Sequence, residues 1–192
     1  MRICIMRHGE TEWNSLGKIQ GRDDIPLNSI GKKQMNDAAD YLKTYSWDII
    51  ICSPLLRARG SAEIISEKTG GVKILEEPDF MERHYGEASG LTVDEAKVRF
   101  PDDVWPGSEP KDALEKRAIR AWQKHTREQD GKNIIVISHG GIISSLLPQL
   151  VSEGLGPEKA RLKNACMSFL EKTGDEYKII FYNKTTDELS NS

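Results

Sequence analysis

The amino-acid sequence predicts a single α/β domain with a mostly parallel central sheet and helices on both of its faces. Short apolar runs alternate along the chain with segments of helical periodicity, which is the pattern of a parallel sheet built from strand–helix units. The runs are continuously apolar, as expected of strands that are buried on both faces. The chain has 192 residues and no repeat, low-complexity tract or linker, so one domain accounts for its length.

Six apolar runs are predicted to be strands. In chain order they are Arg2–Met6, Asp48–Cys52, Val72–Leu75, Ile134–Ser138, Cys166–Leu170 and Lys178–Tyr182. The first run leads into His8 and the fourth into His139, and a glycine follows each histidine. Because ligands of α/β sheets bind beyond the carboxyl ends of the strands, both imidazoles are expected at this binding edge.

Five segments with helical periodicity lie between these strands. They are Ile30–Tyr41, Ala58–Lys68, Thr92–Phe100, Asp112–Glu128 and Gly141–Val151. Asn28 or Ser29 can cap the first helix, Gly70 stops the second, and Pro101 disfavours helix at the residue before it. Pro148 is expected to kink or end the last helix.

Two segments are rich in Gly, Pro and Asp, and both are predicted to be loops over one edge of the sheet. They are Asn14–Leu27 and Pro101–Lys111. The region around residues 80–128 is expected to elaborate the domain with loops and a helix that cover the site. Residues 1–192 are therefore predicted to form one domain.

The composition disfavours nucleic acid and membranes as partners. The chain carries 27 Lys and Arg residues against 30 Asp and Glu residues, which gives a net charge of −3. A mildly acidic protein has no overall basic field to attract nucleic acid or an anionic membrane. The N-terminal apolar run stops at Arg7, too early for a signal peptide, and no run approaches transmembrane length. A cytoplasmic location is therefore expected.

The three cysteines are predicted to be buried thiols. Cys4, Cys52 and Cys166 each lie within or at the end of an apolar run. Their odd number and the absence of a C-x-x-C motif argue against a disulfide framework or a zinc site. A cysteine phosphatase would need five residues between the cysteine and its arginine, but only four separate Cys52 from Arg57.

The sequence Arg7-His8-Gly9 could begin a site for phosphoryl transfer. A neutral imidazole can attack phosphorus and divide one difficult displacement into two easier ones. The guanidinium of Arg7 matches the geometry of phosphate oxygens, and Gly9 permits a tight bend that exposes its amide. Taken alone, these three letters also fit a histidine that merely ends a strand.

Two further segments carry groups suited to the same chemistry. Arg57 follows a strand at the start of a helix, where the helix amino terminus favours anions and a guanidinium adds a forked donor. Glu82, in a glycine-bounded loop, could protonate a leaving oxygen and later deprotonate the attacking water. Taken alone, each segment also fits a role without chemistry. Arg57 could be an exposed surface arginine, and Glu82 could belong to a solvated cluster of charges.

The second histidine opens a helix in the sequence His139-Gly140-Gly141. His139 can donate to phosphoryl oxygens, while the two glycines bring backbone amides close to an anion. Two histidines could instead bind zinc. No carboxylate or cysteine follows at ligand spacing, and the nearby arginines would repel a cation, so neither a metal nor another cofactor is expected.

Taken together and in this order, the motifs resemble those of the histidine phosphatase superfamily, also called phosphoglycerate mutase-like. The resemblance rests on R-H-G-E-T-x-x-N at Arg7–Asn14, P-L-x-x-x-G-x-x-Q at Pro26–Gln34, S-P-L-x-R-A at Ser53–Ala58, E-R-H-Y-G at Glu82–Gly86 with Gly90, and S-H-G-G at Ser138–Gly141. Because the combination is specific, the family's fold is expected here as well.

This resemblance implies a role for each motif residue. His8 would be the phosphorylated nucleophile and Glu82 the proton donor and acceptor. Arg7, Arg57 and His139 would form the phosphate pocket. Substrate contacts are implied for Asn14, Gln20, Gly21, Arg83, Tyr85 and Gly140.

A few positions lie outside the motifs or depart from them. Ser61 stands where the family commonly has threonine and keeps the hydroxyl, whereas Pro110 replaces a usual serine. His84 is expected to be a rim contact at most, and His125 a solvated helix residue. Recognition of the leaving group is assigned to Trp13, Ile19, Arg22, Tyr85 and the Pro101–Lys111 loop.

Family members either hydrolyse phosphomonoesters or move phosphate within phosphoglycerate. Similar mutases carry an insert longer than the 48 residues between Gly90 and His139, and an Arg-Arg pair that this chain lacks. Trp105–Glu109, followed by Arg117, resembles a segment of the small phosphatases. We therefore predict a metal-independent phosphomonoesterase acting on a small metabolite. A cofactor-dependent phosphoglycerate mutase and a catalytically silent phosphate-binding module are the alternatives. The sequence ranks no substrate and indicates no oligomeric state.

Overall fold

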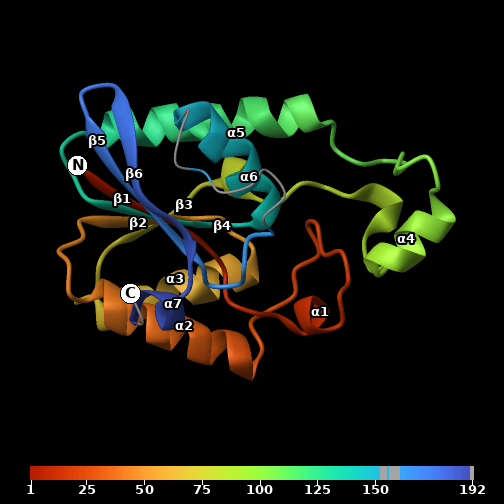
Figure 1. Cartoon of the computed structure of the whole chain (residues 1–192), viewed down its shortest axis with the longest axis horizontal. Coiled ribbons are helices and arrows are strands. Elements are labelled where there is room, and N and C mark those ends of the chain that lie inside the picture. Colours follow the sequence, from red (N-terminus) through yellow and green to blue (C-terminus); the bar gives the residue numbers. More distant parts are fainter. Residues whose placement is uncertain (152–154, 156–160, 191–192) are drawn as a thin grey trace.

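A six-stranded sheet runs through the computed structural model, which describes residues 1–151, 155 and 161–190 (Figure 1). Its strands are β1 (Arg2–Arg7), β2 (Ile49–Cys52), β3 (Ile74–Glu76), β4 (Ile134–Ser138), β5 (Met167–Thr173) and β6 (Glu176–Lys184). In the spatial order β3-β2-β4-β1-β5-β6 the first four strands are parallel, while β5 runs antiparallel to both β1 and β6. The predicted single α/β domain with a mostly parallel sheet is confirmed.

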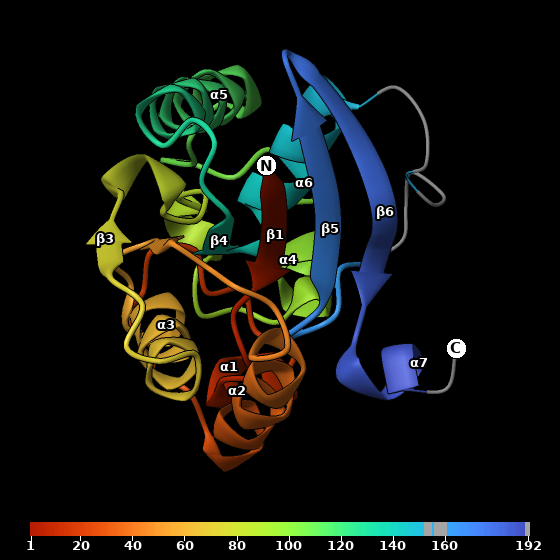
Figure 2. The ribbon, with the colours of Figure 1, turned by 90° about the vertical axis from the view of Figure 1, so that its left-hand side faces the viewer.

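Helices cover both faces of this sheet (Figure 2). Helices α5 (Lys111–Glu128) and α6 (Gly140–Leu150) lie on one face, and α2 (Ser29–Leu42) and α3 (Leu56–Lys68) lie on the other. The shorter elements are α1 (Glu12–Ser15), the 3-10 turns η1 (Pro78–Phe80) and η2 (Gly86–Ala88), α4 (Val93–Arg99) and α7 (Thr186–Ser190). Helices α1 and α4 lie beyond the carboxyl ends of the parallel strands.

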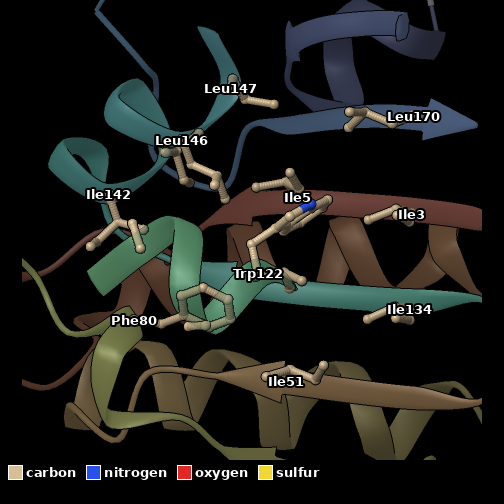
Figure 3. Packing of buried hydrophobic residues seen from close by; sticks show 14 of the residues in the cluster. Ile3, Ile5, Ile51, Phe80, Trp122, Ile134, Ile142, Leu146, Leu147 and Leu170 are labelled. Carbon is tan, nitrogen blue, oxygen red and sulfur yellow. The ribbon is translucent and has the colours of Figure 1, made fainter. Parts of the chain in front are cut away.

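Alternate side chains of each central strand enter opposite halves of the core. In β1, Ile3 and Ile5 join the cluster beneath α5 and α6, in which Trp122 is the largest residue (Figure 3). The intervening Cys4 and Met6 belong to the cluster beneath α2 and α3. Because both faces are covered, the strand reads as a continuous apolar run. Full burial of one such side chain contributes about 1.5–3 kcal/mol.

The register of the parallel strands brings the two histidines together. Arg7 of β1 is the partner of Ser138 of β4, so the residues that follow each of them leave the sheet side by side. Strand β2 lies on the other side of β4, and the amide of Ser53 donates to the carbonyl of Ile137 at 3.1 Å. His8 and His139 therefore meet at one edge, as predicted from the carboxyl ends of the strands, and Ser53 lies beside them.

The boundaries of several elements differ from the sequence-based expectation. Asn14 lies in α1 rather than in a loop, and α3 begins at Leu56, two residues before the predicted start at Ala58. Helix α6 continues for two residues beyond Pro148 before it ends. Two predicted helix ends are confirmed: the side chain of Asn28 accepts from the amide of Gly31 at 2.7 Å, and α4 ends at Arg99, with Phe100 as the C-cap residue before Pro101.

His125 corrects one prediction. Its side chain is buried rather than solvated, with only 5% of the residue exposed, and its Nε2 lies 2.7 Å from Oε2 of Glu77. The reason is helical spacing: His125 continues the stripe of Leu114, Ala118 and Trp122, which faces the sheet. The three cysteines, by contrast, are buried free thiols as predicted.

Candidate active site

A cavity of about 460 Å³ opens at the carboxyl ends of the parallel strands. Its volume suits a small metabolite. Its lining consists of Arg7, His8, Asn14, Gly17, Lys18, Ile19, Gln20, Gly21, Arg57, Glu82, Tyr85, Val93, Trp105, Gly140, Gly141, Ser144, Arg161 and Leu162. Sequence motifs that lie far apart along the chain therefore share one pocket.

His8 presents an unprotonated ring nitrogen to this cavity. Its Nδ1 lies 2.7 Å from the carbonyl oxygen of Gly9, and a carbonyl can only accept, so Nδ1 carries the hydrogen. The Nε2 atom then keeps its lone pair when the ring is neutral. Burial, reinforced by the charges of Arg57 and Arg7, lowers the pKa of His8 well below its usual value. The imidazole is therefore a neutral base with a free Nε2.

His139 lies beside His8, with the two ring centres 5.1 Å apart and the ring planes inclined by 58°. Its Nε2 is 2.8 Å from the hydroxyl of Ser53. Its Nδ1 is buried and has no hydrogen-bond partner among the described residues. Burial first, and then the charge of Arg57, lowers the pKa of His139 well below its usual value. The ring is thus neutral and holds one unused nitrogen.

Two buried guanidinium groups supply positive charge. Arg57 donates to the carbonyl of Gly21 at 2.7 Å and to that of Asp23 at 2.8 Å, which fixes its orientation. Burial lowers the pKa of Arg57 to about 10, so the group remains charged at neutral pH. Arg7 donates to the carbonyl of Leu162 at 2.7 Å. Both Nε groups are buried without a partner among the described residues, as expected where an anion is to be bound.

Glu82 enters the pocket from the loop that follows η1. Its carboxylate accepts from the amide of Arg83 at 2.9 Å and from the amide of Gly141 at 3.0 Å. Gly141 lies in the first turn of α6, and a Cβ atom there would lie 2.4 Å from Oε1 of Glu82. Only glycine therefore allows the carboxylate to approach this helix so closely.

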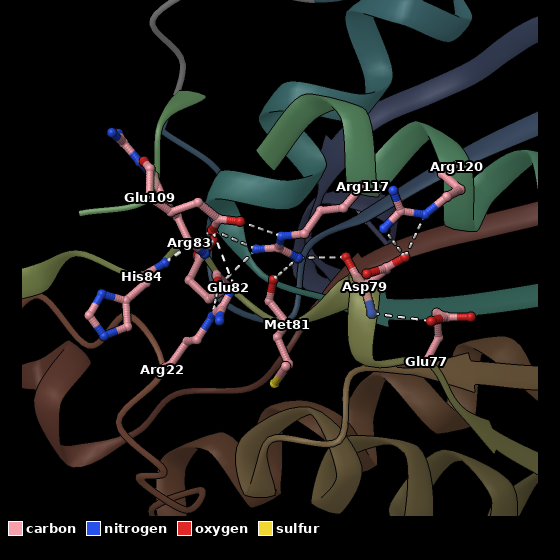
Figure 4. Close-up of polar contacts among 10 residues, drawn as sticks. All are labelled: Arg22, Glu77, Asp79, Met81, Glu82, Arg83, His84, Glu109, Arg117 and Arg120. Carbon is pink, nitrogen blue, oxygen red and sulfur yellow. Dashed lines mark hydrogen bonds and ion pairs between the residues drawn. The ribbon is translucent and has the colours of Figure 1, made fainter. Parts of the chain in front are cut away.

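The guanidinium of Arg117 in α5 fixes the loop that carries Glu82 through hydrogen bonds to its backbone carbonyls (Figure 4). Arg117 donates to the carbonyls of Asp79 and Met81 at 2.6 Å each, and to that of Glu82 at 3.0 Å. The same guanidinium makes paired hydrogen bonds of 2.7 and 3.0 Å to the carboxylate of Glu109. Helix α5 thus fixes the backbone on which the Glu82 side chain depends.

The amide side chains of the pocket have defined orientations. The carbonyl oxygen of Asn14 accepts from Nδ2 of Asn164 at 3.1 Å, and that of Gln20 accepts from the hydroxyl of Thr11 at 2.9 Å. The NH₂ groups of Asn14 and Gln20 are therefore left as donors for a ligand. The charge of Glu82, together with burial, raises the pKa of Tyr85, so its phenol remains protonated and can also donate.

Most of the site residues predicted from the sequence meet at this cavity. Those in its lining are Arg7, His8, Asn14, Gln20, Gly21, Arg57, Glu82, Tyr85 and Gly140, and His139 packs against His8. Arg83 is outside the lining, because its Nε donates to the carbonyl of Glu109 at 2.8 Å. Arg22 is also outside and contacts Glu109 at 3.4 Å. Ser61 accepts from the amide of Gly9 at 3.2 Å, which accounts for the retained hydroxyl.

Three polar residues of the lining were not predicted from the sequence. They are Lys18, Ser144 and Arg161. Lys18 offered a weak signal, a cation between Gly17 and Gly21 in a loop already assigned to the site. Arg161 offered none, because the antiparallel pairing of β5 with β1, which starts β5 at the carboxyl ends of the parallel strands, is a tertiary feature. Trp105, which belongs to the Pro101–Lys111 loop assigned to recognition of the leaving group, lines the cavity.

Among the described residues, no group of three or more His, Cys, Asp or Glu side chains is arranged to hold a metal ion. Within the same part of the chain, no helix combines the length and apolar character needed to cross a membrane.

Comparison with known proteins agrees with this geometry. A sequence profile of the histidine phosphatase superfamily (branch 1) matches residues 3–185. PhoE of Bacillus subtilis, described as an uncharacterized phosphatase, is 39% identical over 94% of this chain and 93% of its own length. A metal-independent phosphoserine phosphatase of Arabidopsis thaliana is 31% identical over 75% of this chain and 66% of its own length. A 2,3-bisphosphoglycerate-dependent phosphoglycerate mutase of Cytophaga hutchinsonii is 29% identical over 81% of this chain and 79% of its own length. Among solved structures, a mutant phosphoserine phosphatase of Entamoeba histolytica in complex with phosphoserine has a TM-score of 0.80, at 27% identity and with 98% of each chain covered.

Proposed function

The chain belongs to the histidine phosphatase superfamily, and we propose that it is a metal-independent phosphomonoesterase that works through a phosphohistidine on His8. The observation that carries this proposal is the hydrogen bond from Nδ1 of His8 to the carbonyl of Gly9. It leaves Nε2 as the nucleophilic atom of a buried, neutral ring in a pocket that also holds two guanidinium groups. The substrate is a small phosphorylated metabolite.

In the first step, Nε2 of His8 attacks phosphorus and the bond from phosphorus to the ester oxygen breaks. Glu82 gives a proton to that oxygen, and a neutral alcohol leaves. In the second step, Glu82 takes a proton from water, the water oxygen attacks phosphorus, and the bond to Nε2 breaks. Inorganic phosphate and neutral His8 are regenerated.

The phosphoryl oxygens are bound by Arg7, Arg57 and His139. The hydroxyl of Ser53 already accepts from the amide of Leu55 at 3.3 Å, so its hydrogen is free to bond to Nε2 of His139. Nδ1 of His139 then carries a hydrogen and donates it to the phosphoryl group. Buried donors that are fixed before the substrate arrives stabilise developing charge without reorganisation. Asn14, Gln20, Gly21, Tyr85 and Gly140 complete the substrate contacts.

Hydrolysis of p-nitrophenyl phosphate in the presence of EDTA tests this proposal. Wild-type protein is expected to release p-nitrophenol with the chelator present, and the His8→Ala variant is expected to be inactive. Activity that disappears with EDTA and returns with zinc would contradict the metal-independent mechanism, and activity that survives in His8→Ala would contradict the assigned nucleophile.

Phosphoglycerate mutase activity is the second candidate, because one of the relatives is a mutase. A mutase must protect its phosphorylated intermediate from water in a closed cationic pocket. The chain lacks the Arg-Arg pair and the long insert that the resemblance associates with mutases, which favours water as the acceptor. Turnover with 2,3-bisphosphoglycerate and phosphoglycerate far above phosphatase turnover would reverse this choice.

A further inference from the structure

The segment that leads into β5 contacts the two residues at the end of β1. Because β5 runs antiparallel to β1, residues 162–166 lie at the carboxyl end of β1. The amide of Arg7 donates to the carbonyl of Cys166 at 3.1 Å, and the amide of Ala165 donates to the carbonyl of His8 at 3.1 Å. Backbone hydrogen bonds between the two segments therefore continue past the strands, as far as the proposed nucleophile.

The side chain of Asn164 connects two parts of the site. Its Nδ2 lies 3.3 Å from the carbonyl oxygen of His8 and 3.1 Å from Oδ1 of Asn14. An amide NH₂ group carries two hydrogens, so each hydrogen can serve one of these acceptors. Asn164 thus joins the residue that carries the proposed nucleophile to a residue that lines the cavity.

The peptide unit between His8 and Gly9 is fixed at both ends. Its carbonyl accepts from the amide of Ala165 and from Nδ2 of Asn164, while its N–H donates to the hydroxyl of Ser61 at 3.2 Å. The ring of His8 in turn donates from Nδ1 to the carbonyl of Gly9 at 2.7 Å. The direction of the free Nε2 therefore depends on this backbone, and a loosened peptide would misalign the attacking atom.

The contact between Asn164 and Asn14 determines which end of the Asn14 amide meets a ligand. Oδ1 of Asn14 accepts from Asn164 and from the amide of Thr11 at 3.2 Å, so the NH₂ group of Asn14 is the end left for phosphoryl oxygens. An acceptor in place of the Asn164 NH₂ group would favour the reversed amide, which would present an oxygen to an anion.

The backbone beside Asn164 adopts a conformation that is uncommon for its residue type. Ala165 has a φ of +54°, in the left-handed region, and only 5% of the residue is exposed. Non-glycine residues persist in this region where the surrounding contacts over-determine them, and such positions cluster at active sites. This turn lets two consecutive residues, Asn164 and Ala165, donate to the same carbonyl of His8.

We propose that Asn164 is a positioning residue of the phosphatase reaction. Its NH₂ group aligns Nε2 of His8 through the His8–Gly9 peptide and fixes Asn14 as a donor to the phosphoryl group. This inference rests on the proposed function. It assigns Asn164 to the attack on phosphorus, not to the protonation of the leaving oxygen by Glu82.

Two substitutions distinguish positioning from a purely structural role. Asn164→Asp keeps the shape of the side chain but replaces both donor hydrogens by an acceptor, whereas Asn164→Ala only removes them. Asn164→Asp is expected to lower kcat/KM for p-nitrophenyl phosphate roughly 100-fold, and Asn164→Ala roughly tenfold. A role in packing alone predicts the reverse order, because aspartate retains the volume of asparagine, so an aspartate variant more active than the alanine variant would overturn the inference.

A second ester identifies the step that Asn164 serves. The losses should be the same for glycerol 3-phosphate as for p-nitrophenyl phosphate, because a misaligned nucleophile slows the attack on either ester. A loss confined to glycerol 3-phosphate, whose leaving group needs an acid, would associate Asn164 with Glu82 and overturn the inference.

Asn133 offers a matched control away from the cavity. It lies before β4, at the opposite end of that strand from the site, where it accepts from the amide of Arg2 at 2.8 Å and donates to the carbonyl of Ser46 at 3.1 Å. Asn133→Asp and Asn133→Ala should leave kcat/KM of the folded protein unchanged. Losses equal to those of the Asn164 variants would show that any loosening of the domain suffices, and would overturn the inference.

Binding of inorganic phosphate, measured by calorimetry, separates this inference from the proposed function. Asn164→Asp should weaken phosphate binding by roughly tenfold, but by less than about threefold in an Asn14→Ala background, where the amide that it reorients is absent. This pattern would support the inference even if the wild-type protein hydrolysed neither ester, a result that would refute the phosphatase. An undiminished loss in the Asn14→Ala background would indicate charge repulsion and overturn the inference. An active phosphatase whose Asn164→Asp variant keeps its turnover and phosphate affinity would overturn the inference alone.

Discussion

Replacing Gly141 by alanine should impair catalysis without destabilising the fold. A Cβ atom at this position would lie 2.4 Å from Oε1 of Glu82, whereas ordinary contacts begin near 3.4 Å, so the carboxylate must retreat by about 1 Å. A misplacement of that size costs on the order of 100-fold in rate. Alanine itself favours a helix over glycine by about 0.5–1 kcal/mol, which offsets part of the steric strain. The Gly141→Ala substitution should therefore lower activity strongly while changing stability little.

The assay measures kcat/KM for glycerol 3-phosphate and for p-nitrophenyl phosphate, together with the midpoint of thermal unfolding. Gly141→Ala is expected to lower the efficiency for the alkyl ester roughly 100-fold and that for p-nitrophenyl phosphate much less, because nitrophenolate leaves with little help from an acid. The unfolding midpoint should shift by no more than a few degrees. Gly60→Ala in α3 is the matched control: its Cβ would lie 3.7 Å from Leu27, an ordinary contact, so activity should be unchanged. A folded Gly141→Ala protein with wild-type efficiency on the alkyl ester would refute the role given to the position of Glu82.

Three further outcomes are expected. Arg117→Lys should lower kcat/KM for glycerol 3-phosphate roughly tenfold and lower the unfolding midpoint, because an ammonium cannot replace five hydrogen bonds of a buried guanidinium; unchanged values for both would contradict the support assigned to α5. Burial lowers the pKa of His8 and His139 in the folded state, so the unfolded chain binds more protons below its histidine pKa of about 6.5. The stabilisation that comes from these two neutral histidines should be fully present above that pH and should be lost as the pH falls. The stability of His139→Gln should decline less steeply with falling pH than that of the wild type. An unfolding midpoint that rises on acidification would contradict this expected pH dependence. Prolonged dialysis against EDTA should leave turnover and unfolding unchanged, whereas a loss that zinc or magnesium restores would indicate a resident metal.

Periodicity and residue spacing were sufficient to predict much of this architecture. The strand that ends at Arg7 and the strand that ends at Ser138 were both predicted, and their parallel register places His8 beside His139. Such strands can be recognised in the sequence, because burial on both faces of the sheet requires an unbroken apolar run. The motifs then identified most of the side chains that line the cavity.

The remaining features depend on tertiary contacts that no local pattern encodes. The sequence does not indicate that Arg83 turns away from the cavity toward Glu109, or that Arg161 returns to it before β5. His125 was misassigned as solvated because a histidine on a charged helix resembles a surface residue, although its spacing matches the buried stripe. Long polar side chains can satisfy several partners, so their direction is decided by whichever neighbours the fold supplies.

The most direct test of the account is to trap the reacting enzyme. Rapid mixing with a radiolabelled phosphomonoester, quenching in base and mapping of the labelled peptide should locate an acid-labile, base-stable phosphoryl group on Nε2 of His8. The adduct should form and decay at rates consistent with turnover, and His8→Ala should yield none. Label found on Nδ1, on another side chain, or nowhere during active turnover would contradict the mechanism.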